Sequence, residues 1–161
     1  MSSTGAQTPP RVVAWLGYGG LLPFISLSLA TVGANFLGAD ARWFNAALLS
    51  YGAVILSFVG ALHWGFAMTL RDLSDSQRTA AFVGSIVPAL VAWLALLAAP
   101  VIAVVLLVAG FAIHYGRDAR LAAAAAVAAD LPAWYLPMRF RLTCVACLSL
   151  IAPAVLKALL R

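Results

Sequence analysis

Hydrophobic positions along the chain form five long runs that are separated by short polar stretches. The runs lie at about residues 12–36, 44–70, 79–98, 101–116 and 142–160. A helix needs about 20 apolar residues to cross about 30 Å of hydrocarbon, and four of the runs reach roughly that length. The runs are too long for strands and do not alternate, and a bilayer gives exposed strand edges no hydrogen-bond partners. The pattern therefore predicts an all-α, polytopic integral membrane protein built as a five-helix transmembrane bundle.

The stretches between the runs complete this predicted organisation. Residues 1–11 form a polar tail, and residues 12–161 form a single transmembrane domain. Residues 117–141 contain an alanine-rich stretch, with aromatic residues and arginines after it, so we expect them to lie along the membrane interface. Prolines inside three runs predict kinks in those helices: Pro23, Pro88 and Pro153.

Composition strengthens the membrane assignment. The chain is 65% hydrophobic, its mean hydropathy is +1.03, and only 9% of its residues are charged, against about 25% in soluble domains. The formal net charge is +5. Because the basic residues lie in the polar stretches, we expect them to contact anionic lipid head groups on the cytoplasmic side rather than nucleic acid.

The distribution of basic residues predicts an orientation. One side of the predicted membrane carries Arg11, Arg71, Arg78, Arg117, Arg120, Arg139 and Arg141. The other side carries Arg42, Lys157 and Arg161. Basic residues are enriched in cytoplasmic loops, so the N-terminus is predicted to be cytoplasmic and the C-terminus periplasmic. The expected location is the inner membrane of a bacterial cell, as a multi-pass protein.

The second run is rich in small residues, which let helix backbones approach closely in lipid. They are Gly52, Ala53, Ser57, Gly60, Ala61 and Gly65. We therefore expect these residues to pack against other helices and the second span to lie at the centre of the bundle.

The two histidines are the main candidates for chemistry. His63 is followed by Trp64 in a short sequence that resembles the one around His114. An ionisable side chain inside a span should face the bundle interior and have a partner. The functional interpretations of His63 are a haem or metal ligand or a proton-handling group, and the structural one is a neutral histidine with a hydrogen-bond partner. Two histidines could hold a b-type haem, but His114 is predicted to lie some 7 Å closer to the cytoplasm, which argues against that pairing.

Two further pairs of residues are candidates. Arg139 and Arg141 flank an aromatic residue at the start of the last span, and we expect them to anchor the helix or bind a lipid phosphate. Cys144 and Cys147 have the spacing of a redox pair, but they lie in an apolar run near the reducing cytoplasm, so a packing role is favoured.

The absences narrow the function. The five aspartates, Asp40, Asp72, Asp75, Asp118 and Asp130, are predicted to lie in loops or at span ends. A chain without a buried carboxylate is a poor candidate for ion-coupled transport. No phosphate loop, nucleophile elbow or metalloprotease motif is present. We therefore expect no catalytic residue, no metal site and no resident cofactor, with haem b as the alternative.

Three segments together resemble a known family. They are residues 16–24, residues 51–65 and residues 135–143. The chain resembles the bacterial membrane-protein family of unknown function that includes mitochondrial transmembrane protein 69. The resemblance covers nearly all of the chain after Arg11 and implies a five-helix membrane protein. It carries no assigned activity or catalytic residues.

Three functional hypotheses follow. The first, which we favour from the sequence, is a small accessory or assembly subunit of a larger membrane complex. The second is a haem- or redox-linked protein that uses His63 with or without His114. The third is a small channel or transporter centred on His63, which the missing carboxylates disfavour.

Overall fold

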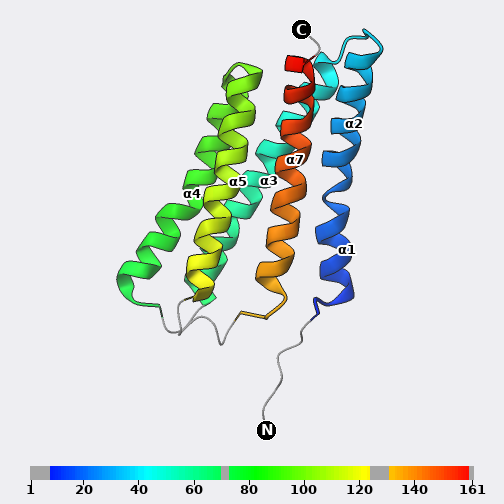
Figure 1. The fold of residues 1–161 in the computed structure, drawn as a ribbon. Helices are drawn as coiled ribbons and strands as arrows, with labels where there is room; N and C mark the ends of the chain where they lie inside the picture. Colours follow the sequence, from blue (N-terminus) through cyan, green and yellow to red (C-terminus); the bar gives the residue numbers. More distant parts are fainter. Residues whose placement is uncertain (1–7, 70–72, 124–130, 160–161) are drawn as a thin grey trace.

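The computed structural model of the chain describes residues 8–69, 73–123 and 131–159. Its helices are α1 (Arg11–Gly19), α2 (Leu22–Phe36), α3 (Arg42–Thr69), α4 (Asp75–Leu97), α5 (Pro100–Ala123) and α7 (Tyr135–Leu159). Five helical segments are long and apolar enough to cross a membrane, with α1 and α2 together forming the first. The helices run side by side along one axis (Figure 1). The predicted all-α transmembrane bundle is confirmed.

Helix α3 lies at the centre of the bundle and packs against α2, α4, α5 and α7. Its glycines allow this close approach. A Cβ atom at Gly60 would lie 2.7 Å from the Ser85 carbonyl oxygen of α4, and one at Gly52 would lie 3.3 Å from leucine side chains of α5 and α7. The predicted packing face needs one correction, because Ala61 and Gly65 are exposed. The helix turns by about 100° per residue, so Gly52 and Gly60 share the buried face that these two residues miss.

The other predicted packing residues of α3 lie as follows. Ala53 is buried, and Ser57 is half-buried. The Ser57 hydroxyl donates to the Ala53 carbonyl one turn earlier, at 2.9 Å, so it needs no partner on another helix.

The first span is broken rather than continuous. Helix α1 ends at Gly19 and α2 begins at Leu22, with Pro23 in its first turn, where proline is well tolerated. The Tyr51 hydroxyl of α3 donates to the Gly20 carbonyl at 2.8 Å and so fixes the break to the centre of the bundle.

The helix ends are closed by local hydrogen bonds. Ser74 and Gln77 form a capping box at the start of α4, in which each side chain bonds the other residue's backbone N–H. After α2, Gly38 adopts a φ of +65°, and the Ala39 N–H donates to the Ala34 carbonyl at 2.8 Å. This reversal favours glycine and ends the helix sharply.

The last two spans are longer than the hydropathy pattern predicts. Helix α5 continues past residue 116 to Ala123, and α7 begins at Tyr135 rather than near residue 142. Much of the expected interfacial segment therefore belongs to these two helices, and its residues 124–130 lie outside the described residues. This extension brings polar side chains of 117–141 into the bundle.

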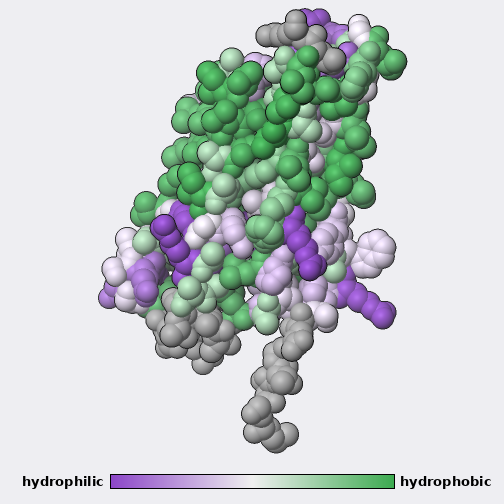
Figure 2. All heavy atoms as spheres, in the orientation of Figure 1, coloured by the Kyte–Doolittle hydropathy of each residue, from purple (hydrophilic) through white to green (hydrophobic). Residues whose placement is uncertain are grey.

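The two ends of the bundle differ in polarity. Hydrophobic side chains cover most of the visible surface, while hydrophilic ones gather toward the end at which α1 begins, at the bottom of the view (Figure 2). We call this the α1 end; α3 and α5 finish there and α7 starts there (Figure 1). From its middle toward the opposite end the bundle has an apolar core, in which the largest fully buried side chains are Phe24, Leu48, Leu56, Leu107 and Leu150.

Candidate functional site

Four ionisable side chains meet inside the α1 half of the bundle. His63 comes from α3, His114 and Asp118 from α5, and Arg139 from α7, and we call these four the polar centre. Their exposed fractions are 3%, 1%, 1% and 8%. His114 and Asp118 are four residues apart, so one face of α5 presents both of them. Burial of four such groups is costly in a membrane protein, so the polar centre is the candidate functional site.

The polar centre is a chain of close contacts across three helices. His63 Nδ1 lies 3.1 Å from His114 Nε2, and the two rings meet edge to face. His63 Nε2 lies 3.5 Å from Asp118 Oδ1. The Arg139 Nε–H donates to Asp118 Oδ2 at 2.9 Å. The order is therefore His114, His63, Asp118, Arg139, with the one buried arginine–carboxylate pair of the described residues at its end.

The expectation that the depths of the two histidines keep them apart is wrong. It took Arg117 as the end of the fourth span, but α5 continues beyond this residue. The Arg117 guanidinium donates to the Gly84 carbonyl of α4 at 2.6 Å and to the Ala80 carbonyl at 3.3 Å. Because Gly84 has no side chain, the guanidinium can lie against the α4 backbone, where an added Cβ atom would clash with it.

The expectation that the aspartates lie in loops or at span ends is also wrong for Asp118, which is buried inside α5. The expected role of Arg139 needs the same correction. Its guanidinium is buried against Asp118 rather than free to contact lipid phosphate. Each charge allows the burial of the other, because either one alone would be strongly disfavoured.

Several buried polar atoms at this site lack a hydrogen-bond partner among the described residues. They are His63 Nε2, His114 Nδ1, Asp118 Oδ1, Tyr135 Oη, Arg139 Nη2 and Thr143 Oγ1. The Tyr135 hydroxyl lies close to Asp118 and Arg139 without the geometry of a hydrogen bond to either. Such groups are rare in proteins, and each costs about 1–3 kcal/mol when it is left unpaired.

Sequence reasoning missed Tyr135 and Thr143 as members of this site. The signal available was their spacing, because Tyr135, Arg139 and Thr143 recur every fourth residue and therefore share one face of α7.

Three residues of the polar centre could offer ligand atoms to a metal ion. One atom each of His63, His114 and Asp118 lies within 4.8 Å of the others. Two histidines and a carboxylate are a set that transition metals use. The surrounding charges oppose a divalent cation, because Arg139 already neutralises Asp118 and the Arg117 guanidinium lies nearby. The site therefore suits a neutral ligand better than a metal ion.

A cavity of about 540 Å³ adjoins the polar centre, between the first span, α3 and α7. Its wall is mostly apolar, with Leu16, Phe24, Phe58, Leu62, Phe111 and Leu142 among the lining residues. The polar part of the wall comes from α7, where Tyr135, Arg139 and Thr143 line the cavity. An apolar cavity with a few polar groups at one place is typical of small-molecule sites.

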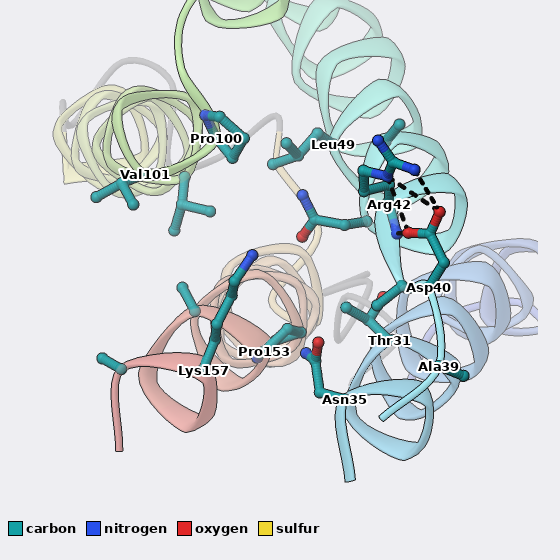
Figure 3. Close-up of a pocket in the computed structure, with 16 residues that line it drawn as sticks. Thr31, Asn35, Ala39, Asp40, Arg42, Leu49, Pro100, Val101, Pro153 and Lys157 are labelled. Atoms are coloured by element: carbon teal, nitrogen blue, oxygen red, sulfur yellow. Dashed lines mark hydrogen bonds and ion pairs between the residues drawn. The ribbon is translucent and has the colours of Figure 1, made fainter. Parts of the chain in front are cut away.

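A second hollow lies at the opposite end of the bundle (Figure 3). Asp40 and Arg42 line it and form an exposed ion pair, with 2.8 Å between the two side chains. Hydrogen bonds from Arg42 lower the pKa of Asp40 to about 2. Lys157 also lines the hollow, from α7. These charged groups are exposed, so their pairing contributes little to stability. The rest of the lining is largely apolar and includes Leu49, Val104 and Pro153.

The remaining candidates lie away from the polar centre. Trp64 is half exposed and packs against Phe82 of α4. Arg141 is exposed, and its guanidinium donates to the Tyr18 hydroxyl at 3.4 Å, a long contact. Cys144 and Cys147 are half-buried free thiols. The interfacial role of Arg141 and the packing role of the cysteines stay predictions.

Comparison with known proteins gives a family but no activity. Residues 9–155 match the model of a family described as a protein of unknown function, DUF3429. The chain is 35% identical over 146 residues to transmembrane protein 69 of Xenopus tropicalis. The match covers 88% of this chain and 53% of that relative, so the chain spans about half the length of the curated relative it matches. No solved structure matches.

Proposed function

Since the chain belongs to the DUF3429 family of membrane proteins of unknown function, we propose a function from its polar centre: the protein binds a small molecule within the membrane, in the cavity beside this centre. The observation that carries this proposal is the group of buried polar atoms without partners. A ligand that pairs even two of them offsets a few kcal/mol of unfavourable burial. Tyr135, Arg139 and Thr143, which carry three of these atoms, line the adjoining cavity.

The opposite half of the bundle favours binding over conduction. Among the described residues, its buried polar groups are the hydroxyls of Ser28, Thr31 and Ser149, and no buried histidine or charged residue lies there. Leu56 and Leu107 are fully covered in its core. An ion or proton path needs polar groups or water along its length. The buried Asp118 supplies the carboxylate that the channel or transporter hypothesis was expected to lack. The hypothesis is still not favoured, because buried charged groups do not continue into the opposite half of the described residues.

The accessory-subunit hypothesis gains no support from the buried glycines of α3. It was favoured by the small residues of this helix and by the lack of catalytic residues, and of these small residues Ala61 and Gly65 are exposed. Gly52 and Gly60 already contact α4, α5 and α7, so the close packing that they permit is used within the chain. Docking on a larger complex stays a prediction that the contacts within this chain do not require.

The haem hypothesis meets a geometric difficulty. The facing nitrogens of His63 and His114 are 3.1 Å apart. A metal between two trans imidazoles needs about 2 Å on each side, or roughly 4 Å in total. The histidines would have to separate, with loss of their mutual contact, so we favour a ligand that leaves them in place.

We also retain the proposed location. The multi-pass helical bundle and the transmembrane relative support a membrane home. The bacterial inner membrane, with the α1 end toward the cytoplasm and its anionic lipids, follows from the positive-inside rule. Single cysteines at Thr8 or Lys157, in a chain whose two native cysteines are replaced by Ser, would test the orientation through their reactivity toward a membrane-impermeant maleimide. Labelling of position 8 in intact cells would contradict it.

The proposed binding can be tested by extracting the full chain directly from its membrane into polymer-bounded nanodiscs. Native mass spectrometry should show one small molecule retained at near-unit occupancy. Thr143→Val removes an unpartnered hydroxyl and should reduce the occupancy. Thr31→Val is the matched control, because the Thr31 hydroxyl already donates within its own helix at 2.8 Å, and this variant should retain the molecule.

Three outcomes would overturn the proposal. The first is an empty wild-type protein in native nanodiscs. The second is proton flux into pyranine-loaded proteoliposomes that exceeds the protein-free background and disappears in His63→Gln, since this result would support conduction. The third is a stoichiometric divalent metal that His63→Ala and Asp118→Asn both remove, since the site would then bind a metal ion and not a small molecule.

A further inference from the structure

Three residues of α7 that carry hydrogen-bond donors line the cavity next to the polar centre. Tyr135, Arg139 and Thr143 recur there at intervals of four residues, and each has a covered side-chain N–H or O–H group without a partner among the described residues. A ligand in the cavity reaches these groups once the atoms that cover them shift. A guanidinium N–H can only donate a hydrogen bond, while the two hydroxyls can donate or accept. The matching ligand therefore carries an acceptor oxygen.

The charge of the site selects the kind of acceptor. The Arg139 charge is already balanced by Asp118, whose carboxylate accepts from Arg139 at 2.9 Å. A carboxylate or phosphate would add a second negative charge beside a buried carboxylate, which is unfavourable where water is excluded. A neutral carbonyl oxygen accepts from the free Arg139 N–H without changing the net charge. The balance therefore favours a neutral carbonyl over an anionic head group.

The shape and surroundings of the cavity describe the rest of the ligand. The volume, about 540 Å³, falls within the usual range for small-molecule sites. Four aromatic side chains line the cavity: Phe24 of α2, Phe58 of α3, Phe111 of α5 and Trp134, which precedes α7. Leu16 and Phe58 are exposed on the outer surface, so the cavity borders the region that lipid occupies. The ligand is therefore lipid-soluble and carries a flat apolar group that can lie among aromatic rings.

We propose that the cavity binds the head group of a lipid-soluble quinone, with a carbonyl oxygen accepting hydrogen bonds from Arg139 and its neighbours on α7. This inference rests on the proposed function and names the class of its ligand. The proposal concerns binding only. The bound quinone would leave His63 and His114 in contact with each other, with Asp118 between them and Arg139. Fatty acids share the lipid solubility but bring an anionic carboxylate, so they are the discriminating alternative.

Trp134 provides a direct probe, because it is half-buried on the cavity wall and quinones quench tryptophan fluorescence. We would prepare the full chain in nanodiscs with Trp134 as its single tryptophan, the others being replaced by Phe. A matched variant would retain only Trp93, which is 59% exposed on α4 and does not line the cavity. A benzoquinone with a decyl tail should quench Trp134 saturably and Trp93 only in proportion to its concentration in the lipid.

The donors should matter for affinity. Tyr135→Phe and Thr143→Val should each weaken saturable quenching about fivefold to tenfold, the value of one hydrogen bond. Thr31→Val should leave it unchanged. Equal, non-saturating quenching of Trp134 and Trp93 would overturn the quinone inference.

A second measurement separates failure of the ligand class from failure of the proposed function. If palmitate displaces the quinone and binds more tightly, the inference of a neutral carbonyl ligand is wrong, although the cavity would still bind a small molecule. If neither compound binds and native nanodiscs also hold no small molecule, the proposed function fails together with this inference.

Discussion

The two halves of this bundle are built from the same helices but differ in the side chains that they bury. In the half toward the opposite end, Leu56, Leu107 and Leu150 are fully covered in an apolar core, and the charged residues of the second hollow are exposed. In the α1 half, the same helices bury His63, His114 and Asp118 with polar atoms left unpaired. A core optimised only for stability would not retain such atoms. The contrast indicates that one half holds the helices together and the other half holds a site.

The strongest test of this comparison removes one partner of the buried ion pair. Asp118→Ala leaves the Arg139 guanidinium buried without a counter-charge, and we expect a loss of about 3–5 kcal/mol in the free energy of unfolding. Unfolding in mixed micelles, followed by circular dichroism, measures the loss. Asp75→Ala is the control, because Asp75 is exposed in the first turn of α4. Equal losses in the free energy of unfolding for the two variants would show that the buried ion pair does not stabilise the fold.

A cavity in the apolar half should separate stability from binding. Leu56→Ala should destabilise the protein by about 2 kcal/mol, near the low end for such substitutions, because in lipid mainly packing is lost. Ligand occupancy in native nanodiscs should stay unchanged once the protein is folded. A loss of occupancy equal to that of Thr143→Val would show that the two halves are not separable.

The glycines of α3 offer a matched pair for the packing argument. Gly60→Ala places a methyl group 2.7 Å from the Ser85 carbonyl oxygen and should cost about 1–3 kcal/mol as α3 and α4 move apart. Gly65→Ala meets nothing within 4 Å, so it should be neutral or slightly stabilising through helix propensity. Thermal midpoints in one detergent compare them. Similar destabilisation by both would contradict the assigned packing face.

A smaller effect should distinguish the two buried threonines. Thr143→Val removes an unpaired hydroxyl, so the ligand-free protein should become more stable by up to about 1 kcal/mol. Thr31→Val removes a hydroxyl that already donates to the Leu27 carbonyl and should not stabilise the protein. Thermal unfolding of delipidated samples gives the comparison. Destabilisation by Thr143→Val in the absence of ligand would mean that its hydroxyl has a partner in the folded protein.

The smallest effect is expected at the exposed ion pair of the second hollow. The folded-state pKa of Asp40, about 2, lies below its ordinary value of 3.8, so its contribution is present above pH 3.8 and is lost as the pH falls toward 2. Because both side chains are exposed, salt and water screen the pair. Asp40→Asn should therefore match the wild type in thermal midpoint at pH 7. A clear loss at pH 7 that added salt does not reduce would contradict this assignment.

The fold could be predicted from the sequence because lipid imposes a simple rule. A run of about 20 apolar residues has one stable conformation in a bilayer, so five runs predict five spans. The ends of the spans were harder to predict. Arg117 and Arg139 look like interfacial residues by their charge, yet their guanidinium groups find partners inside the helices, at the Gly84 carbonyl and at Asp118. A hydropathy pattern places a charged residue in a loop, because it does not show whether a partner inside the bundle allows that residue to be buried.

The candidate site was predicted only in part for the same reason. His63 was identified because it stands alone in an apolar run. Asp118 was not, because it lies between arginines in a stretch that hydropathy assigns to a loop. Its spacing of four residues from His114 was the available signal, but such a spacing gains meaning only when a second helix presents a partner. The meeting of α3, α5 and α7 depends on the relative rotation of the spans, which no local pattern encodes.

The break after α1 has a mechanical consequence. None of the residues of α1 is buried, and the helix is fixed at one end, where Tyr51 holds the Gly20 carbonyl. Farther out, Gly17 rests against Met138 of α7. Helix α1 thus forms one wall of the cavity without belonging to the core. Its contacts with α7 include the flexible Met138 and the exposed Arg141, which donates to Tyr18, so on this side the cavity is bounded by a helix whose outer face only the bilayer supports.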